Sequence, residues 1–168
     1  MSFIPYLVSG ISLGSIYALI ALGYTMVYGI AKMLNFAHGD VIMIGAYMAY
    51  ISVSTLKLSP FFAILIAIIT CTLLGILIER VAYKPLRNSS PLTVLITAIG
   101  VSYLLQNVAL LIFGSKSVNF TSLVSVPSIT VGDGLTISGE TIVTIAVSLV
   151  IMLALSLFIN HTKPGRAM

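Results

Sequence analysis

The sequence predicts an all-α integral membrane protein, a polytopic helical bundle with about five transmembrane helices. Hydrophobic residues make up 59% of the 168 residues and charged residues only 7%, and the mean hydropathy is +1.17. Soluble domains carry roughly a quarter of their residues as charged side chains. The apolar residues form long uncharged runs, and none of these alternates polar and apolar residues with period 2, which favours helices over barrel strands. This composition excludes a soluble enzyme, a disordered tail and a nucleic-acid-binding module.

Five uncharged runs define the expected helices. About 20 residues at 1.5 Å each cross ~30 Å of hydrocarbon, and in lipid a helix satisfies all its own backbone hydrogen bonds. The second run is short, so we expect it to be tilted or to include part of the segment before it. The first run lacks the basic start and the cleavage site of a signal peptide, so it is interpreted as a helix of the mature protein. The expected helices, within one transmembrane domain over residues 1–168, cover residues 6–31, 41–56, 58–78, 90–115 and 141–160.

The basic residues predict the orientation, because cytoplasmic loops of membrane proteins are enriched in Lys and Arg. Arg80, Lys84 and Arg87 follow the third run. Lys163 and Arg166 follow the fifth run, two crossings later, and therefore fall on the same side. We expect the C-terminal end of this chain in the cytoplasm and the N-terminus outside. On the same scheme the two lysines that fall outside are Lys57 and Lys116.

One sizeable external segment is expected, from Lys116 to Glu140. Within it, residues 124–138 are expected to form a short β-hairpin-like loop, because Val, Ile and Thr favour extended backbone and a Gly132-Asp133-Gly134 turn admits positive φ. The segment is interpreted either as a solvated connector or as a docking surface for a soluble partner.

Small residues recur every four positions on the first two expected helices. Such spacing lets helix backbones approach closely, which drives association in lipid. We expect these residues to pack helices within the chain, and the alternative is contact with a second subunit. They are Gly10, Gly14 and Ala18 on the first helix and Gly45 and Ala49 on the second.

A short polar stretch separates the first two apolar runs. It contains Asn35, His38, Gly39 and Asp40. Polar groups in hydrocarbon are costly unless they face protein or water. The stretch is therefore either a cytoplasmic loop or a non-helical turn that enters a protein-lined cavity. In the second case we expect Asn35 and His38 to face a translocation path, with Gly39 allowing the turn and Asp40 capping the next helix.

The sequence contains no constellation typical of an enzyme. Cys71 is the single cysteine, so there is no internal disulfide, and His38 and Asp40 provide too few ligands for a closed metal site. No Walker-type phosphate-binding loop is present. We therefore expect no catalytic residues, no metal and no cofactor bound by this chain, and any ATP that drives it must be used by another subunit.

Three stretches resemble the permease subunits of branched-chain amino acid ABC importers. The first is GSIYALIALGYTMVYGIAKMLNFAHGDVIMIGAY, from Gly14 to Tyr47, which resembles the start of those permeases. The second is ERVAYKPLR followed by LTVLITAIGVSYLLQN. The third, TKPGRAM, resembles the approach to the family's cytoplasmic coupling loop and places Lys163, Gly165 and Arg166 on the ATPase side.

The resemblance implies a subunit of a multi-pass importer in the prokaryotic plasma (inner) membrane. Family members are longer, with about eight helices, so this chain is expected to be an N-terminal fragment. The implied partners are a second related permease, two ATP-binding subunits and an extracytoplasmic substrate-binding protein, within the lipid bilayer and without nucleic acid. The implied cargo is a branched-chain amino acid.

Other functions stay open at this point. Urea and short-chain amide permeases share the family. A secondary transporter or channel would use His38, Asp40 and Glu79 as a proton or cation path, because ionisable groups within membranes often serve such paths. A membrane scaffold without transport activity is the third class.

Overall fold

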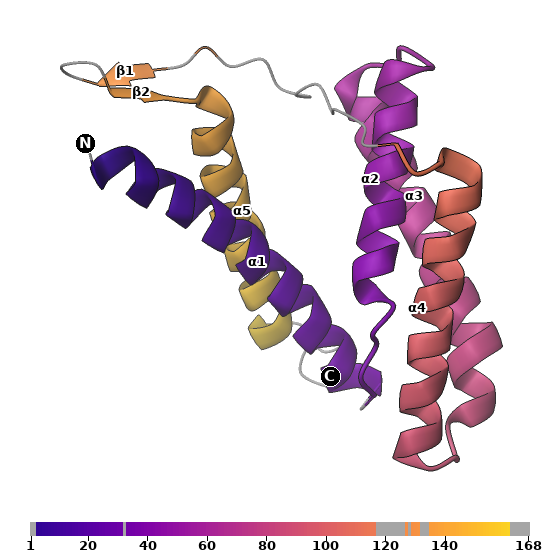
Figure 1. Ribbon diagram of the computed structural model, residues 1–168. Coiled ribbons are helices and arrows are strands. Elements are labelled where there is room, and N and C mark those ends of the chain that lie inside the picture. Colours follow the sequence, from indigo (N-terminus) through magenta and orange to yellow (C-terminus); the bar gives the residue numbers. More distant parts are fainter. Residues whose placement is uncertain (1–2, 32, 117–126, 128, 132–134, 162–168) are drawn as a thin grey trace. The chain divides into compact units, whose positions relative to one another are not determined.

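The computed structural model describes residues 3–31, 33–116, 127, 129–131 and 135–161. Within them lie five α-helices and one pair of short strands (Figure 1). The helices are α1 (Phe3–Ala31), α2 (His38–Ser54), α3 (Pro60–Ile78), α4 (Pro91–Phe113) and α5 (Gly139–His161). A π-helical turn (Glu79–Tyr83) and a 3-10 turn (Lys84–Leu86) continue α3 beyond the end expected from the sequence.

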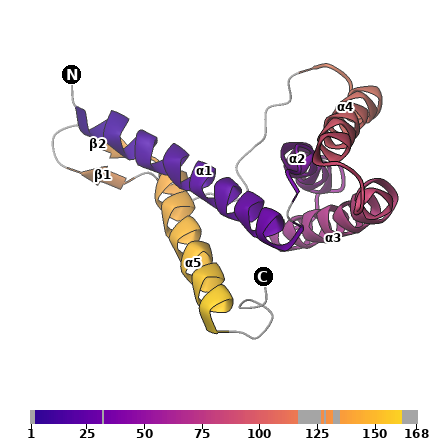
Figure 2. The same cartoon turned by 90° about the horizontal axis from the view of Figure 1, so that it is seen from below.

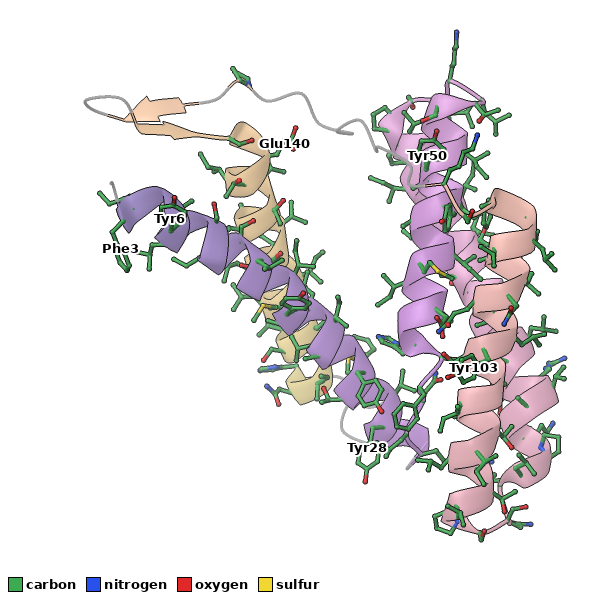
Figure 3. The ribbon with its side chains drawn as sticks, in the orientation of Figure 1. Phe3, Tyr6, Tyr28, Tyr50, Tyr103 and Glu140 are labelled. Atoms are coloured by element: carbon green, nitrogen blue, oxygen red, sulfur yellow. The ribbon has the colours of Figure 1, made fainter. Side chains whose placement is uncertain are left out.

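Four of these helices are long and apolar enough to cross a membrane. They are the helical segments Tyr6–Gly29, Pro60–Leu86, Pro91–Phe113 and Gly139–His161. Their large apolar side chains are mostly uncovered: Leu111 is 85% exposed and Phe61 72% exposed. Figure 3 shows Phe3 and Tyr6 projecting from the first turns of α1. Surfaces this apolar require lipid or another protein around them, so the helical membrane class is confirmed. Helix α2 has 17 residues and is shorter than the other four helices.

The chain divides into two compact units. The first contains α1, α5 and the strand pair, β1 (Ile129–Val131) and β2 (Leu135–Ile137), which run antiparallel with Thr130 opposite Thr136. Helices α1 and α5 pack against each other, and β2 contacts α1. The turn expected at residues 132–134 lies outside the described residues.

The second unit contains α2, α3 and α4, and the views in Figures 1 and 2 agree that these helices lie side by side. Helix α2 packs most extensively on α3. Gly45 permits this approach, because a Cβ added there would lie 2.6 Å from the Cys71 Sγ atom. Cys71 also donates a hydrogen bond to the backbone oxygen of Val41 at 3.5 Å.

Local sequence signals explain where α3 and α4 begin and where α4 ends. Both helices start with proline, whose missing N–H costs nothing at the first position. Ser90 caps α4 by accepting a hydrogen bond from the Thr93 amide at 3.3 Å. Gly114 ends α4 with φ at +78°, a conformation that favours glycine, and its amide donates to the Leu110 oxygen at 2.9 Å.

Candidate functional site

The polar stretch before α2 is a non-helical turn with its own hydrogen bonds. Residues 33–37 carry no helix. The Asn35 Oδ1 atom accepts a hydrogen bond from the Ala37 amide at 3.1 Å, and the Asn35 backbone oxygen accepts one from the His38 amide at 3.2 Å. An Asn side chain that accepts a hydrogen bond from the backbone amide two residues later forms an Asx turn, which stabilises the reversal of the chain. We call residues 33–37 the break.

The break is attached to the extension of α3 by a tyrosine. The Tyr83 hydroxyl donates a hydrogen bond to Asn35 Oδ1 at 2.7 Å. Tyr83 is the last residue of the π-helical turn. Because π-helical turns are uncommon and are frequent at functional sites, this turn is a second reason to place the site here.

The break lies well inside the helical layer of the second unit. Ala37, which is fully buried, packs in one cluster with Ile78 and Leu105. Leu105 is about 21 Å along α4 from Pro91, at 1.5 Å per residue. Figure 1 shows the same offset, with α2 beginning part of the way along α4. Non-helical backbone at such a level is tolerated where it is covered by protein or lines a water-filled cavity.

A polar cluster, in which Asp40 is buried, Ser102 half-buried and Gln106 exposed, joins the first turn of α2 to the middle of α4. The Asp40 carboxylate is only 8% exposed. Its Oδ2 atom accepts a hydrogen bond from the Ser102 hydroxyl at 2.5 Å, and its Oδ1 atom accepts one from Gln106 Nε2 at 3.1 Å. Gln106 Nε2 also donates to Ser102 Oγ at 3.1 Å. We call Asp40, Ser102 and Gln106 the polar cluster.

Two local expectations for this stretch were wrong. Asp40 does not cap α2: the helix begins at His38, the capping position is Ala37 without a side-chain cap bond, and the Asp40 oxygens bind α4 instead. Gly39 does not make the turn, because it is already in α2, exposed, and has no positive φ. The chain turns at residues 33–37, where the Asn35 side chain supplies the hydrogen bonds.

The other residues selected from the sequence lie as follows. His38 is half-buried at the start of α2, and Glu79 is exposed on the π-helical turn. Gly45 is buried against α3 and Ala49 is half-buried. Gly10 and Gly14 are exposed on α1, with nothing within 4 Å of an added Cβ, and Ala18 is half-buried. Lys163, Gly165 and Arg166 lie outside the described residues.

Sequence reasoning missed three residues that hold this site, namely Tyr83, Ser102 and Gln106. One signal was available for two of them: Ser102 and Gln106 are four residues apart in an apolar helix and therefore share one face. Nothing in the sequence indicated which helix that face meets. Within the described residues, no group of three or more His, Cys, Asp or Glu side chains is placed to hold a metal ion.

Four long apolar helices define a multi-pass helical membrane protein, and in its second unit the buried Asp40 carboxylate is hydrogen-bonded by two side chains of α4. The chain matches the family described as the permease component of the branched-chain amino acid transport system over residues 6–168. It belongs to that family of transport permeases.

Several curated relatives have the same degree of similarity. They include the high-affinity branched-chain amino acid transport system permease proteins BraD of Pseudomonas aeruginosa and LivH of Salmonella typhimurium and Escherichia coli K12. Each is 42% identical over 177 aligned residues, which cover 98% of this chain and 57% of the relative. The chain thus spans little more than half the length of these relatives. No solved structure matches it.

Proposed function

We propose that this chain forms part of the translocation path of an ATP-driven importer for branched-chain amino acids in a bacterial inner membrane. The observation that carries the proposal is the placement of the break and the polar cluster inside the second unit's helical layer. A zwitterionic amino acid crosses hydrocarbon only where dipoles or water replace its hydration. Non-helical backbone, together with the buried Asp40 and its hydrogen-bond partners Ser102 and Gln106, supplies such polar groups.

The proposed partners rest on membership of a family of transport-system permeases. We propose a second related permease, two ATP-binding subunits and an extracytoplasmic substrate-binding protein. This chain would bind no cofactor, and ATP would be hydrolysed on the separate subunits. Because a transporter is shifted only by ligands with different affinities for its two states, ATP and the loaded binding protein would supply the energy.

The proposed arrangement places the N-terminus outside and the end of this chain in the cytoplasm. Helix α2 would cross the membrane in addition to the four longer helices. Because α2 is about 25 Å long and the hydrocarbon is ~30 Å thick, the break would complete its crossing. The strand pair β1 and β2 would then lie outside. Asn35 and His38 would face the path, and the small residues Gly10, Gly14, Ala18, Gly45 and Ala49 would pack helices.

Reconstitution tests this function directly. The full-length permease is placed in proteoliposomes with its partner permease, its ATP-binding subunits and its binding protein, and leucine uptake is measured. We expect uphill uptake that requires ATP and disappears when the ATP-binding subunits are left out. Accumulation driven by a proton gradient alone would instead assign a secondary transporter that uses His38, Asp40 and Glu79. Competition by urea or acetamide, but not by valine, would assign the amide branch of the family.

A further inference from the structure

A hollow of about 380 Å³ opens between α2 and α4 beyond the polar cluster. Its volume is within the range of about 300–1,000 Å³ that is usual for small-molecule sites. Tyr47 forms part of its wall and is held by stacking on Phe113, with ring centroids 4.2 Å apart and planes 5° from parallel. The residues that matter for its chemistry are Met43, Tyr47, Gln106, Ala109, Leu110 and Lys116.

The lining combines apolar side chains with polar ones on Tyr47, Gln106, Ser115 and Lys116, and two of these, Gln106 and Lys116, can bind opposite ends of a zwitterion. Gln106 belongs to both the polar cluster and the hollow. Its Nε2 atom is committed to Asp40 and Ser102, whereas within the described part of the chain its Oε1 atom accepts no hydrogen bond. The orientation of the amide is fixed, because Nε2 must donate to the carboxylate. Oε1 is therefore available as an acceptor for a cationic N–H group.

Lys116 provides a positive charge that can bind a carboxylate. It is exposed just beyond the end of α4 and lines the same hollow. An ammonium group on a flexible stem binds carboxylates as a point charge. Met43, Ala109 and Leu110 supply the apolar wall, and a methionine side chain adapts to ligands of different shape.

We propose that this hollow is a binding site for an amino acid with a small apolar side chain, which would be the first contact of the cargo with this chain. Lys116 binds the carboxylate, Gln106 Oε1 accepts a hydrogen bond from the ammonium group, and the wall of Met43 and Leu110 covers the side chain. This inference rests on the proposed function and adds the location and the chemistry of a site. An anionic lipid headgroup shares part of this chemistry, so the test must separate the two ligands.

The test is protection of a cysteine from labelling, in the assembled full-length importer in detergent. Cys71 is first replaced by Ser, which can keep the hydrogen bond to Val41. The reporter is Leu110→Cys, at a residue that lines the hollow and is 51% exposed. The matched control is Leu111→Cys, at the adjacent residue, which is 85% exposed and is not part of the hollow. A maleimide labels both, with and without leucine.

We expect leucine to slow labelling at position 110 and to leave position 111 unchanged. Lys116→Gln should raise the leucine concentration for half-protection by about tenfold or more, because a charge-assisted hydrogen bond is lost. Lys116→Arg should keep most of the protection, and Lys57→Gln, which removes the other lysine expected outside, should have no effect. Leucine analogues that lack the ammonium group (4-methylpentanoate) or the carboxylate (3-methylbutylamine) should protect less than leucine.

Two results would overturn the site while leaving the importer intact. One is normal ATP-driven uptake without any leucine protection at position 110, or with protection that Lys116→Gln does not change. The other is protection by phosphatidylglycerol but not by leucine, which would assign the hollow to lipid. Loss of uptake in the unaltered importer would count against the proposed function. A Met43→Cys reporter replaces Leu110→Cys if the latter does not assemble, and the same outcomes apply.

Discussion

A carboxylate covered by protein inside an apolar chain is stable only when its oxygens are hydrogen-bonded, and Asp40 meets this requirement through Ser102 and Gln106. The two partners come from the same face of α4, so the cluster ties the start of α2 to the middle of α4. Removing the carboxylate loses both bonds: the Ser102 hydroxyl loses the acceptor that it has in this cluster, and Gln106 Nε2 keeps only its bond to Ser102 Oγ. Asp40 therefore ties the start of α2 to α4.

The first prediction concerns this bond pair. Asp40→Ala should lower the free energy of unfolding by about 1–3 kcal/mol, because hydrogen bonds to a charged group are lost in a covered position. A double-mutant cycle with Ser102→Ala should give a coupling energy between about 0.6 kcal/mol, the average for bonds between membrane helices, and about 1.7 kcal/mol, the maximum. Thermal unfolding in detergent measures both, with the exposed Glu79→Gln as control. Additive effects of the two substitutions would show that the bond does not contribute.

The second prediction concerns the contact between α2 and α3. Gly45→Ala places a Cβ 2.6 Å from Cys71 Sγ, so the sulfur must rotate or the helices must separate. We expect a loss of about 1–3 kcal/mol, as for other overpacked cores. Gly75→Ala is the matched control: it is helical and has nothing within 4 Å of the added atom, so it should be neutral or slightly stabilising. Cys71→Ala should rescue Gly45→Ala, and a failure of this rescue would contradict the contact.

At the scale of residues, the sequence indicated which side chains are unusual but not which side chains they contact. Asn35, His38 and Asp40 stood out because polar residues are rare in an apolar chain, and the structure places Asn35 and Asp40 in hydrogen-bonded contacts. Gly45 stood out through its spacing from Ala49. The same spacing selected Gly10 and Gly14, which contact nothing within 4 Å of an added Cβ. Small-residue spacing does not reveal which helix faces which, because that depends on tertiary packing.

At the scale of elements, the largest difference from expectation is the path of α3. Its apolar run ends at Ile78, yet the backbone continues helically through the π-helical turn and the 3-10 turn to Leu86. Hydropathy could not predict this, because charged residues can extend a helix beyond the hydrocarbon. The extension carries Tyr83 to Asn35 and thereby helps to hold the break in place. Helix α2 likewise begins at His38, before the run of uncharged residues starts.

The third prediction tests the attachment of the break. Tyr83→Phe keeps the ring and removes the hydroxyl that donates to Asn35, which should cost roughly 0.5–1.5 kcal/mol of stability. Because the break would be less well positioned, leucine uptake by the assembled importer should fall while the assembly itself is retained. The control is Tyr103→Phe, at an exposed residue of α4 that projects from the helix in Figure 3. Equal uptake by the two variants would contradict a role for this bond.

At the scale of the whole molecule, the number and type of the elements followed from hydrophobicity alone. Five apolar runs become five helices, because an α-helix satisfies all its own backbone hydrogen bonds in lipid and the runs lack the alternation of barrel strands. The level of the break could not be predicted, because the nine residues between the two apolar runs suit both a surface loop and a turn inside the layer. The burial of Ala37 against Ile78 and Leu105 favours the second of these alternatives.

The fourth prediction concerns the proposed orientation. Ser89→Cys lies after the 3-10 turn and Lys57→Cys lies between α2 and α3. In Cys71→Ser protein, an impermeant maleimide should label position 89 only in inside-out vesicles and position 57 only in right-side-out vesicles. The reverse pattern would invert the topology, and labelling of both positions from one side would exclude a crossing by α3 and its extension.

The central claim is that the residues around the break line a path whose access changes during transport. It is tested by placing cysteine at Asn35 and at His38 in a full-length, Cys71-free importer and measuring maleimide labelling in the resting, leucine-loaded and ATP-bound states. We expect the labelling rates at both positions to change severalfold between states, while an exposed control, Glu79→Cys, stays constant. Equal labelling from the cytoplasm in all three states would contradict the claim and leave an ordinary loop.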